Sequence, residues 1–311
     1  MRICSLQPGA TEIIAALGLT DQLVALSHEC DYPQAVAGLP AVTKPFTAAG
    51  ALSCREIDRA VAEQLASGSP LFEIDAAALA AANPDLLIAQ DLCHVCGITP
   101  DQLEQVIASL PTKLQLLTVG GSTLQDVLRD ISRIGQATGR TERADALIHD
   151  LRSRCEAVQA RQATRTQRPR VVCLEWLDPF YVAGHWTPEL VALAGGQDVL
   201  GQAGARSRQV SWVEIAAAEP DVLLVMPCGF SLDRTIRELR SHCPALPWGQ
   251  LPAVRNERVF ALDGNAHFSR PGPRLIEGLE ILEALVAGED RCARLPPGAH
   301  RISWLQEPVK L

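Results

Sequence analysis

Short runs of apolar residues alternate along the chain with longer segments whose apolar positions recur at helical spacing. Such runs predict buried strands, because helices cover both faces of a parallel sheet and its strands are apolar along their whole length. The expected strands are residues 2–6, 23–26, 86–89, 114–119, 171–174, 222–225 and 259–262. Ser53, with Glu56 three residues later, predicts the start of a helix that extends through Leu65. The pattern therefore indicates an α/β fold with parallel-rich sheets.

A long charged segment separates the strands of the two halves. From Ser122 to about Gln162 the apolar positions fit one helical stripe, which only Gly135 and Gly139 interrupt. We expect a single long α-helix here, joining two Rossmann-like lobes that have a ligand cleft between them. The expected boundaries are residues 1–120 for the N-terminal lobe, 121–165 for the linker helix and 166–311 for the C-terminal lobe.

The two halves contain similar sequences. DAAALAAANPDLLIAQDLCHVCG at 75–97 parallels EIAAAEPDVLLVMPCGF at 214–230. Each has a helix, a turn with Pro-Asp, a buried strand and a cysteine at the carboxyl end of that strand. Ligands of open parallel sheets bind beyond the carboxyl ends of the strands. A duplicated lobe therefore predicts that strand ends from both halves face one cleft.

Composition and charge exclude several classes of protein. The chain is 47% hydrophobic and 21% charged, with a formal net charge of −8 and no run of Lys or Arg that would indicate a nucleic-acid partner. No apolar stretch reaches the ~18 residues of a membrane span. The first residues lack the basic start and apolar run of a secretory signal, and ten cysteines are present. We therefore expect reduced thiols and a cytoplasmic location, or a periplasmic one if the start codon is misassigned.

Several cysteines fall on loops that follow predicted strands. Thiolates that converge from separate loops hold zinc or iron–sulfur clusters. The candidate metal ligands are Cys30, Cys93, Cys96 and Cys228, together with His28 and His94. The competing interpretation is that the cysteines pack as small apolar side chains. A metal or iron–sulfur site is therefore one hypothesis for the function.

A thiol-dependent enzyme is another hypothesis. Cys93 or Cys30 with His267 could form a nucleophile pair, but no element of the sequence indicates an oxyanion site. We therefore expect a binding protein and not an enzyme.

Several segments occur in an order that is characteristic of one family. They are RICSLQPGATEIIAALGL, CDYP, NPDLLIA, LDPFYVAGHWTPELVALAGGQDVL, SWVEIAAAEPDVLLV and FSRPGPRLIEGLEIL. Over almost its whole length the chain resembles the cobalamin and iron-chelate substrate-binding proteins of ABC importers. SHECDYP, QDLCHVC, LEWLDP and MPCGF resemble a cysteine-bearing subgroup known as cobalamin-binding proteins.

The resemblance implies two lobes, a rigid linking helix and a ligand held between the lobes by the strand-end loops. The residues at the corresponding positions are Tyr32, Gln90, Asp91, Trp176, His185, Trp186, His267 and Phe268. The tryptophans could lie against a corrin face, and a neutral histidine suits cobalt as an axial ligand. The predicted ligand is therefore cobalamin or a related metal chelate.

The resemblance also implies docking on an ABC permease through one surface Glu of each lobe. In the second lobe Glu214 stands at the matching place. The matching position in the first lobe is about Ala77, which is not acidic, although Asp75 is near. An ABC permease is the implied partner.

Overall fold

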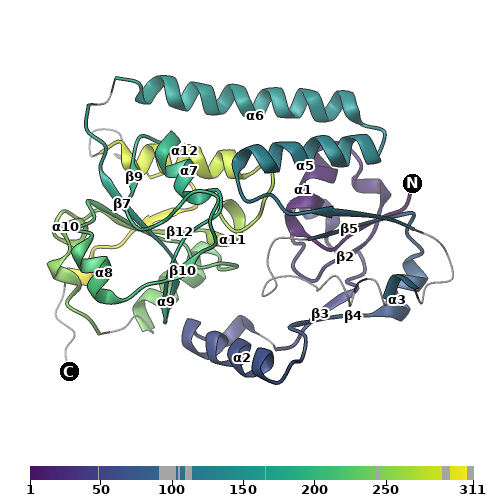
Figure 1. Ribbon diagram of the computed structural model, residues 1–311, viewed down its shortest axis with the longest axis horizontal. Coiled ribbons are helices and arrows are strands. Elements are labelled where there is room, and N and C mark those ends of the chain that lie inside the picture. The colour runs from purple at the N-terminus through teal and green to yellow at the C-terminus, as the bar shows by residue number, and fades with distance from the viewer. Residues whose placement is uncertain are drawn as a thin grey trace.

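The computed structural model describes residues 1–47, 49–90, 103, 106–108, 114–164, 166–241, 245–288 and 295–306. Figure 1 shows two α/β lobes side by side, with helices lying along one side of both. Lobe 1 contains the N-terminal strands and lobe 2 the strands that follow residue 166. The predicted fold class, with two parallel-rich lobes, is confirmed.

Lobe 1 is built on a parallel sheet whose strands lie in the order β2-β1-β5-β6. These strands are β1 (Ile3–Ser5), β2 (Leu23–Leu26), β5 (Leu86–Gln90) and β6 (Gln115–Val119). Helix α1 (Pro8–Ala16) follows β1, and helix α3 (Ala76–Ala82) precedes β5. All of β1 and the first four residues of β5 are buried, which explains why these strands lack polar alternation.

Lobe 2 is built on a larger sheet in the order β10-β8-β7-β11-β12-β13, and β9 also pairs with β7. Its strands are β7 (Arg170–Leu177), β8 (Phe180–Val182), β9 (Gln197–Asp198), β10 (Arg208–Gln209), β11 (Val222–Val225), β12 (Val259–Leu262) and β13 (Ala299–Arg301). Its helices are α7 (Thr187–Leu193), α8 (Trp212–Ala217), α9 (Leu232–Ser241), α10 (Pro252–Arg255), α11 (Gly264–His267) and α12 (Leu275–Val286). Strands β7, β11 and β12 run parallel, so their carboxyl ends share one edge of the sheet.

The sequence repeat corresponds to a repeated structure. In lobe 1 the carboxylate of Asp85 accepts a hydrogen bond from the backbone N–H of Arg2 at 2.7 Å, and the Arg2 guanidinium donates to the last turn of α3. In lobe 2 Asp221 and Arg170 make the same contacts with each other, at 2.8 Å, and with the end of α8. The Pro-Asp turn therefore aligns a helix end with the start of two strands in both lobes.

The segment predicted to be one helix consists of two, α5 (Leu124–Ala137) and α6 (Thr141–Gln162). The chain reverses at Gly139, which has a φ of +68°, a conformation that glycine adopts without steric cost. Gly135 allows the two helices to approach each other, since a Cβ there would collide with the Cβ of Ala144. The expected linker range of 121–165 is thus corrected to a helical hairpin, of which only α6 spans both lobes.

Helix α6 lies over both lobes (Figure 1). Near its start the Arg143 guanidinium donates to the carbonyl of Leu17 in lobe 1 at 2.9 Å. Toward its end Arg154 forms a bidentate pair with Glu280 of α12, and Arg161 does so with Glu283. Helix α6 has 22 residues but is charged, and within the described ranges no helix is both long and apolar enough to cross a bilayer.

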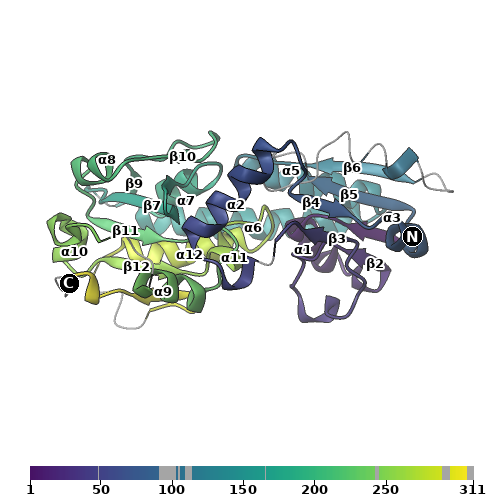
Figure 2. The same cartoon turned by 90° about the horizontal axis from the view of Figure 1, so that it is seen from below.

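Residues 43–47 and 49–74 extend from lobe 1 as an arm. Strands β3 (Thr43–Pro45) and β4 (Phe72–Ile74) pair with each other, and α2 (Cys54–Ala66) lies between them in the sequence. Ser53 caps α2 in a capping box with Glu56, as predicted. Figure 2 shows α2 crossing from lobe 1 toward lobe 2 on the side opposite α6.

Candidate functional site

The loops at the carboxyl ends of β2 and β12 meet between the lobes. In lobe 1 Asp31 follows β2, and its carboxylate accepts hydrogen bonds from Arg270 and, at 3.0 Å, from the amide of Asn265. Arg270 also donates to the carbonyl of Glu29 at 3.1 Å. The two sheets therefore present their carboxyl ends to a common region, where ligands of parallel sheets bind.

A buried ion cluster holds these loops in place. Glu12 of α1 is only 4% exposed and accepts two hydrogen bonds from Arg274, at 2.6 and 3.0 Å. Arg270 lies 3.5 Å from the same carboxylate. A buried carboxylate is tolerated only when it is paired and hydrogen-bonded. We call Glu12, Asp31, Asn265, Arg270 and Arg274 the interlobe joint.

Electrostatic interactions in the joint favour its ionised form. Burial opposes the charge of Asp31, but hydrogen bonding and the positive charge of Arg270 lower the pKa of Asp31 overall. Burial alone would lower the pKa of Arg270, but the hydrogen bond and negative charge of Asp31 raise it overall. Both groups are therefore charged across the physiological range, and they attract each other between the lobes.

The arm makes a second contact between the lobes, at the carboxyl end of β7. The indole N–H of Trp176 donates to the carbonyl of Cys54 at 3.2 Å. Asp178, just beyond β7, pairs with Arg55 at 2.7 Å. The backbone N–H of Cys54 donates to the carboxylate of Glu238 at 2.8 Å. The start of α2 therefore lies directly on the strand-end loops of lobe 2.

Three of the predicted ligand residues are exposed or half-buried at or near the strand ends. Tyr32 follows Asp31 of the joint, is 44% exposed and lies under the guanidinium of Arg274, 3.9 Å from the ring centroid. Gln90 is the half-buried last residue of β5, and Asp91 lies outside the described residues. Trp176 is half-buried and meets Phe230 edge-on at 5.4 Å between centroids.

The other predicted ligand residues lie in lobe 2, and the structure places two of them in its core. Trp186 is 3% exposed and donates to the carbonyl of Phe268 at 2.8 Å, and Phe268 is 5% exposed. Both belong to the hydrophobic core, so the structure does not present either side chain at the surface where a ligand would lie. His267 packs against Gly298 and lies 3.7 Å from Glu277, within lobe 2. His185 is half-buried and its backbone N–H donates to the carbonyl of Ala205 at 2.6 Å.

The predicted metal ligands do not form a site in the described part of the chain. His28 turns toward Thr43, 2.7 Å from its hydroxyl, whereas the Cys30 thiol accepts from the hydroxyl of Thr11 at 3.1 Å. Burial raises the pKa of Cys30 to about 11, which disfavours a thiolate. Cys228 is exposed, and Cys93, His94 and Cys96 lie outside the described residues. Among the residues that are described, no three His, Cys, Asp or Glu side chains could hold a metal ion together.

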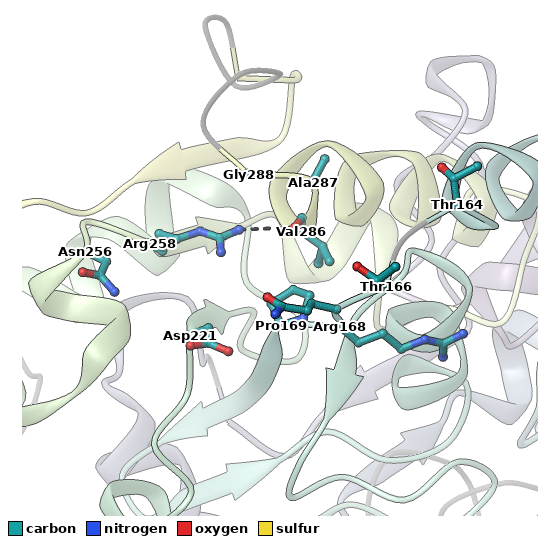
Figure 3. Close-up of a pocket in the computed structure, with 11 residues that line it drawn as sticks. Thr164, Thr166, Arg168, Pro169, Asp221, Asn256, Arg258, Val286, Ala287 and Gly288 are labelled. Carbon is teal, nitrogen blue, oxygen red and sulfur yellow. Dashed lines mark hydrogen bonds between the residues drawn. The ribbon is translucent and has the colours of Figure 1, made fainter.

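A cavity of about 530 Å³ lies at the other edge of the lobe 2 sheet (Figure 3). Pro169, Asp221 and Arg258, which immediately precede β7, β11 and β12, contribute to its lining. Arg258 donates to the carbonyls of Leu285 and Val286 there. Because this is the amino edge of the sheet, the cavity is at the wrong end for a ligand of the strand-end loops.

Comparison with known proteins places the chain among periplasmic binding proteins. The model of the periplasmic binding protein family matches residues 3–266. The vitamin B12-binding protein of Vibrio parahaemolyticus is 26% identical over 284 residues, which cover 91% of this chain and 88% of the relative. An uncharacterised ABC-transporter substrate-binding lipoprotein of Bacillus subtilis is 25% identical over 290 residues, with coverages of 90% and 78%.

Solved structures share the fold. The periplasmic vitamin B12-binding protein of Vibrio cholerae has a TM-score of 0.66 at 24% identity, and covers 94% of this chain and 98% of its own. A periplasmic heme-binding protein of Roseiflexus has a TM-score of 0.68 at 24% identity, with coverages of 92% and 97%. At these identities the structures establish the fold alone.

These comparisons correct the expected location and two hypotheses. The relatives are periplasmic proteins or a substrate-binding lipoprotein, so the expectation of a cytoplasmic protein is wrong. They give no support to a cytoplasmic metal or iron–sulfur protein, to bound zinc or to a thiol enzyme. Sequence reasoning also missed the joint, although the PGATE and SRPGPR segments that supply Glu12, Arg270 and Arg274 were among those that indicated the family.

Asp31→Asn tests the joint. Because the folded pKa of Asp31 is lowered, its carboxylate contributes stability above the unfolded pKa of about 3.9, and the contribution is lost as the pH falls through the folded pKa. We expect urea unfolding at pH 7 to show a loss of about 1 kcal/mol, a value discounted for partial exposure. The loss should shrink as the pH falls below about 3.9.

The control is Glu63→Gln, which alters an exposed pair within α2. It should change the free energy of unfolding by less than about 0.5 kcal/mol at either pH. An effect of Asp31→Asn that stays the same at pH 7 and pH 3 would contradict the charged interaction.

Proposed function

The chain belongs to the periplasmic binding protein family, and we propose that it binds a corrinoid of the cobalamin type between its two lobes. At the coarser level it is a substrate-binding protein for a small-molecule ligand, associated with an ABC transporter. The observation that carries the proposal is the meeting of strand-end loops from both lobes at the interlobe joint. By analogy with the relatives, we place the protein in the periplasm.

The choice of a corrinoid rests on the relatives that match along the whole chain. The vitamin B12-binding protein of Vibrio parahaemolyticus aligns over 91% of it. Solved heme-binding proteins share the fold at similar TM-scores, so heme is the alternative that the experiment must separate. Both ligands are large, flat macrocycles, and aromatic side chains suit their faces.

Tyr32 is the residue we propose as the aromatic contact. Within the described residues it is the one exposed aromatic side chain. The guanidinium of Arg274 covers its ring on one side, which fixes the ring in place while it remains 44% exposed. Gln90 at the end of β5 and Trp176 at the end of β7 complete the proposed contacts.

A histidine is proposed as the cobalt ligand, and His185 fits better than His267. The carbonyl of Ala205 accepts a hydrogen bond from the His185 backbone N–H. The neighbouring Gly204 lies close to Thr123, the residue that caps α5. The backbone N–H of Leu124 in turn donates a hydrogen bond to the carboxylate of Glu189 of α7 at 3.0 Å. His185 therefore lies near the place where the start of α5 contacts lobe 2, whereas His267 lies beside Glu277 of α12.

Titration with cyanocobalamin, hemin and a ferric hydroxamate tests the ligand class. We expect cyanocobalamin to bind and to shift its absorbance band. Tyr32→Ala should weaken binding about tenfold, equivalent to about 1.4 kcal/mol, because the aromatic contact is lost. Tyr32→Phe keeps the ring and should bind within about threefold of the wild type.

Binding of hemin without binding of cyanocobalamin would replace the corrinoid by heme. Equal affinities for Tyr32→Ala and Tyr32→Phe would show that the ring of Tyr32 does not contact the ligand. Replacing His185 by Ala should change the cobalt spectrum if its imidazole coordinates the metal, and an unchanged spectrum would exclude it.

We propose that Glu214 docks lobe 2 on the permease. It is exposed on α8, where the backbone N–H of the Ser211 cap and the Arg208 guanidinium lower its pKa to about 2. Its charge is therefore constant at physiological pH. Lobe 1 differs, because α3 has no acidic residue in its first turn and Asp75 caps that helix while pairing with Lys44.

Glu214→Gln separates docking from folding, because Gln can keep the capping box while removing the charge. We expect affinity for the cognate importer in proteoliposomes to fall at least tenfold, with cyanocobalamin affinity unchanged. Asp233→Asn, in the first turn of α9, is the matched control and should leave docking intact. Normal docking of Glu214→Gln would exclude Glu214 as the docking residue.

A further inference from the structure

The arm belongs to lobe 1 at its base and touches lobe 2 at its tip. At the base, Thr43 pairs with Ile74 and Pro45 with Phe72, and this ribbon is separate from the main sheet of lobe 1. At the tip, the start of α2 is held by lobe 2. The arm is attached to lobe 1 and docked on lobe 2. Any motion of the arm relative to lobe 2 therefore changes the contacts at its tip.

The tip is anchored by specific contacts with the two strand-end loops of lobe 2. Arg234, in the first turn of α9, donates to the carbonyls of Ala49 at 2.6 Å and Leu52 at 3.0 Å. The side chain of Cys54 is fully buried among apolar residues of lobe 2, near Leu177 at the end of β7. Trp176 and Asp178 hold the same turn of α2 from β7.

Beyond its first turn, α2 adds only the partly buried Ile57 to the apolar contact with lobe 2. Of its 13 residues only Cys54 is buried, and Arg59 pairs with Glu63 on the exposed side. Burial and the nearby Asp178 carboxylate raise the pKa of Asp58, so that two carboxylates repel each other across the contact. The tip is therefore held by a few hydrogen bonds, the Arg55–Asp178 ion pair, the buried thiol of Cys54 and the partly buried side chain of Ile57. So small a contact can open without unfolding the lobes.

The arm also lies where a ligand would enter. Helix α6 covers the opposite side of the molecule, and α2 crosses between the lobes on this side (Figures 1 and 2). The tip contacts the end of β7 and the start of α9, which follows the β11 loop. These are loops of the proposed ligand site.

We infer that the arm is a gate: its tip leaves lobe 2 as a unit to admit the ligand and docks again to enclose it. The gating role rests on the proposed function, whereas the opening of the arm does not. Undocking exposes Cys54, while Cys4 in β1 and Cys173 in β7 stay buried unless a lobe unfolds. The cysteines therefore distinguish opening of the arm from global unfolding.

Alkylation with N-ethylmaleimide, followed by peptide mass mapping, measures the opening without any ligand. Arg234→Ala removes two hydrogen bonds of the tip and should speed the labelling of Cys54 about tenfold or more, with Cys4 and Cys173 unchanged. Arg55→Ala is a second variant that removes the ion pair with Asp178 and should act in the same direction. Arg59→Ala, on the same helix but away from lobe 2, is the control and should leave Cys54 protected.

An unchanged Cys54 rate in both variants would overturn the opening of the arm, as would a rate that rises only together with those of Cys4 and Cys173. Stopped-flow mixing with cyanocobalamin then tests the gate. Faster association with Arg234→Ala than with Arg59→Ala is expected, and equal rates despite faster labelling of Cys54 would overturn the gate. If cyanocobalamin binds to no variant, the corrinoid proposal fails and the labelling result alone decides whether the arm opens.

Discussion

The buried contact of Glu12 with Arg270 and Arg274 fixes how the two lobes face each other. Glu12 is on α1, immediately after the first strand, and both arginines precede the last long helix of lobe 2. A carboxylate so deeply buried is strongly destabilising if a partner is removed. Any large rotation of the lobes would separate these charges. The joint therefore keeps the carboxyl ends of β2 and β12 opposed, and with them the region in which a ligand can touch both lobes.

The remaining connections divide into rigid and movable ones. Helix α6 is continuous over both lobes, contains no proline and is tied to α12 by two bidentate ion pairs, so it resists bending. The arm on the opposite side has only a short ribbon at its base and one anchored turn at its tip. In the proposed gate, binding and release therefore depend on the arm more than on motion of whole lobes.

The strands and the repeat of the two lobes could be predicted from the sequence because their signals are local. Buried parallel strands are apolar throughout, and the Pro-Asp turn recurs at Asp85 and Asp221 with the same role in each lobe. The break of the helical segment was not foreseen, although Gly139 marks it. A glycine within a helical pattern can be tolerated, and only the packing of α5 on α6 shows that the chain turns there.

The site could be predicted only in part, because its geometry joins residues that are far apart in the chain. Position near a strand end selects Tyr32, which lies in the loop after β2, and Trp176, which is the penultimate residue of β7. It could not distinguish them from Trp186 and Phe268, which follow strands or short helices in the same way but turn into the core. No periodic pattern links Cys54 with Trp176 or Arg270 with Asp31, so the arm contact and the joint emerged only from the structure.

Hydrogen–deuterium exchange with and without cyanocobalamin tests the central claim that the ligand binds between the lobes. The account predicts slower exchange on binding in the β2 loop at 27–32 of lobe 1. In lobe 2 it predicts slower exchange at the end of β7 and the residue after it, 175–178, and in the β11 loop at 226–231. Protection in both lobes would show that strand-end loops of the two sheets share the ligand. Protection confined to one lobe, or found around the cavity at 166–169 and 286–288, would contradict it.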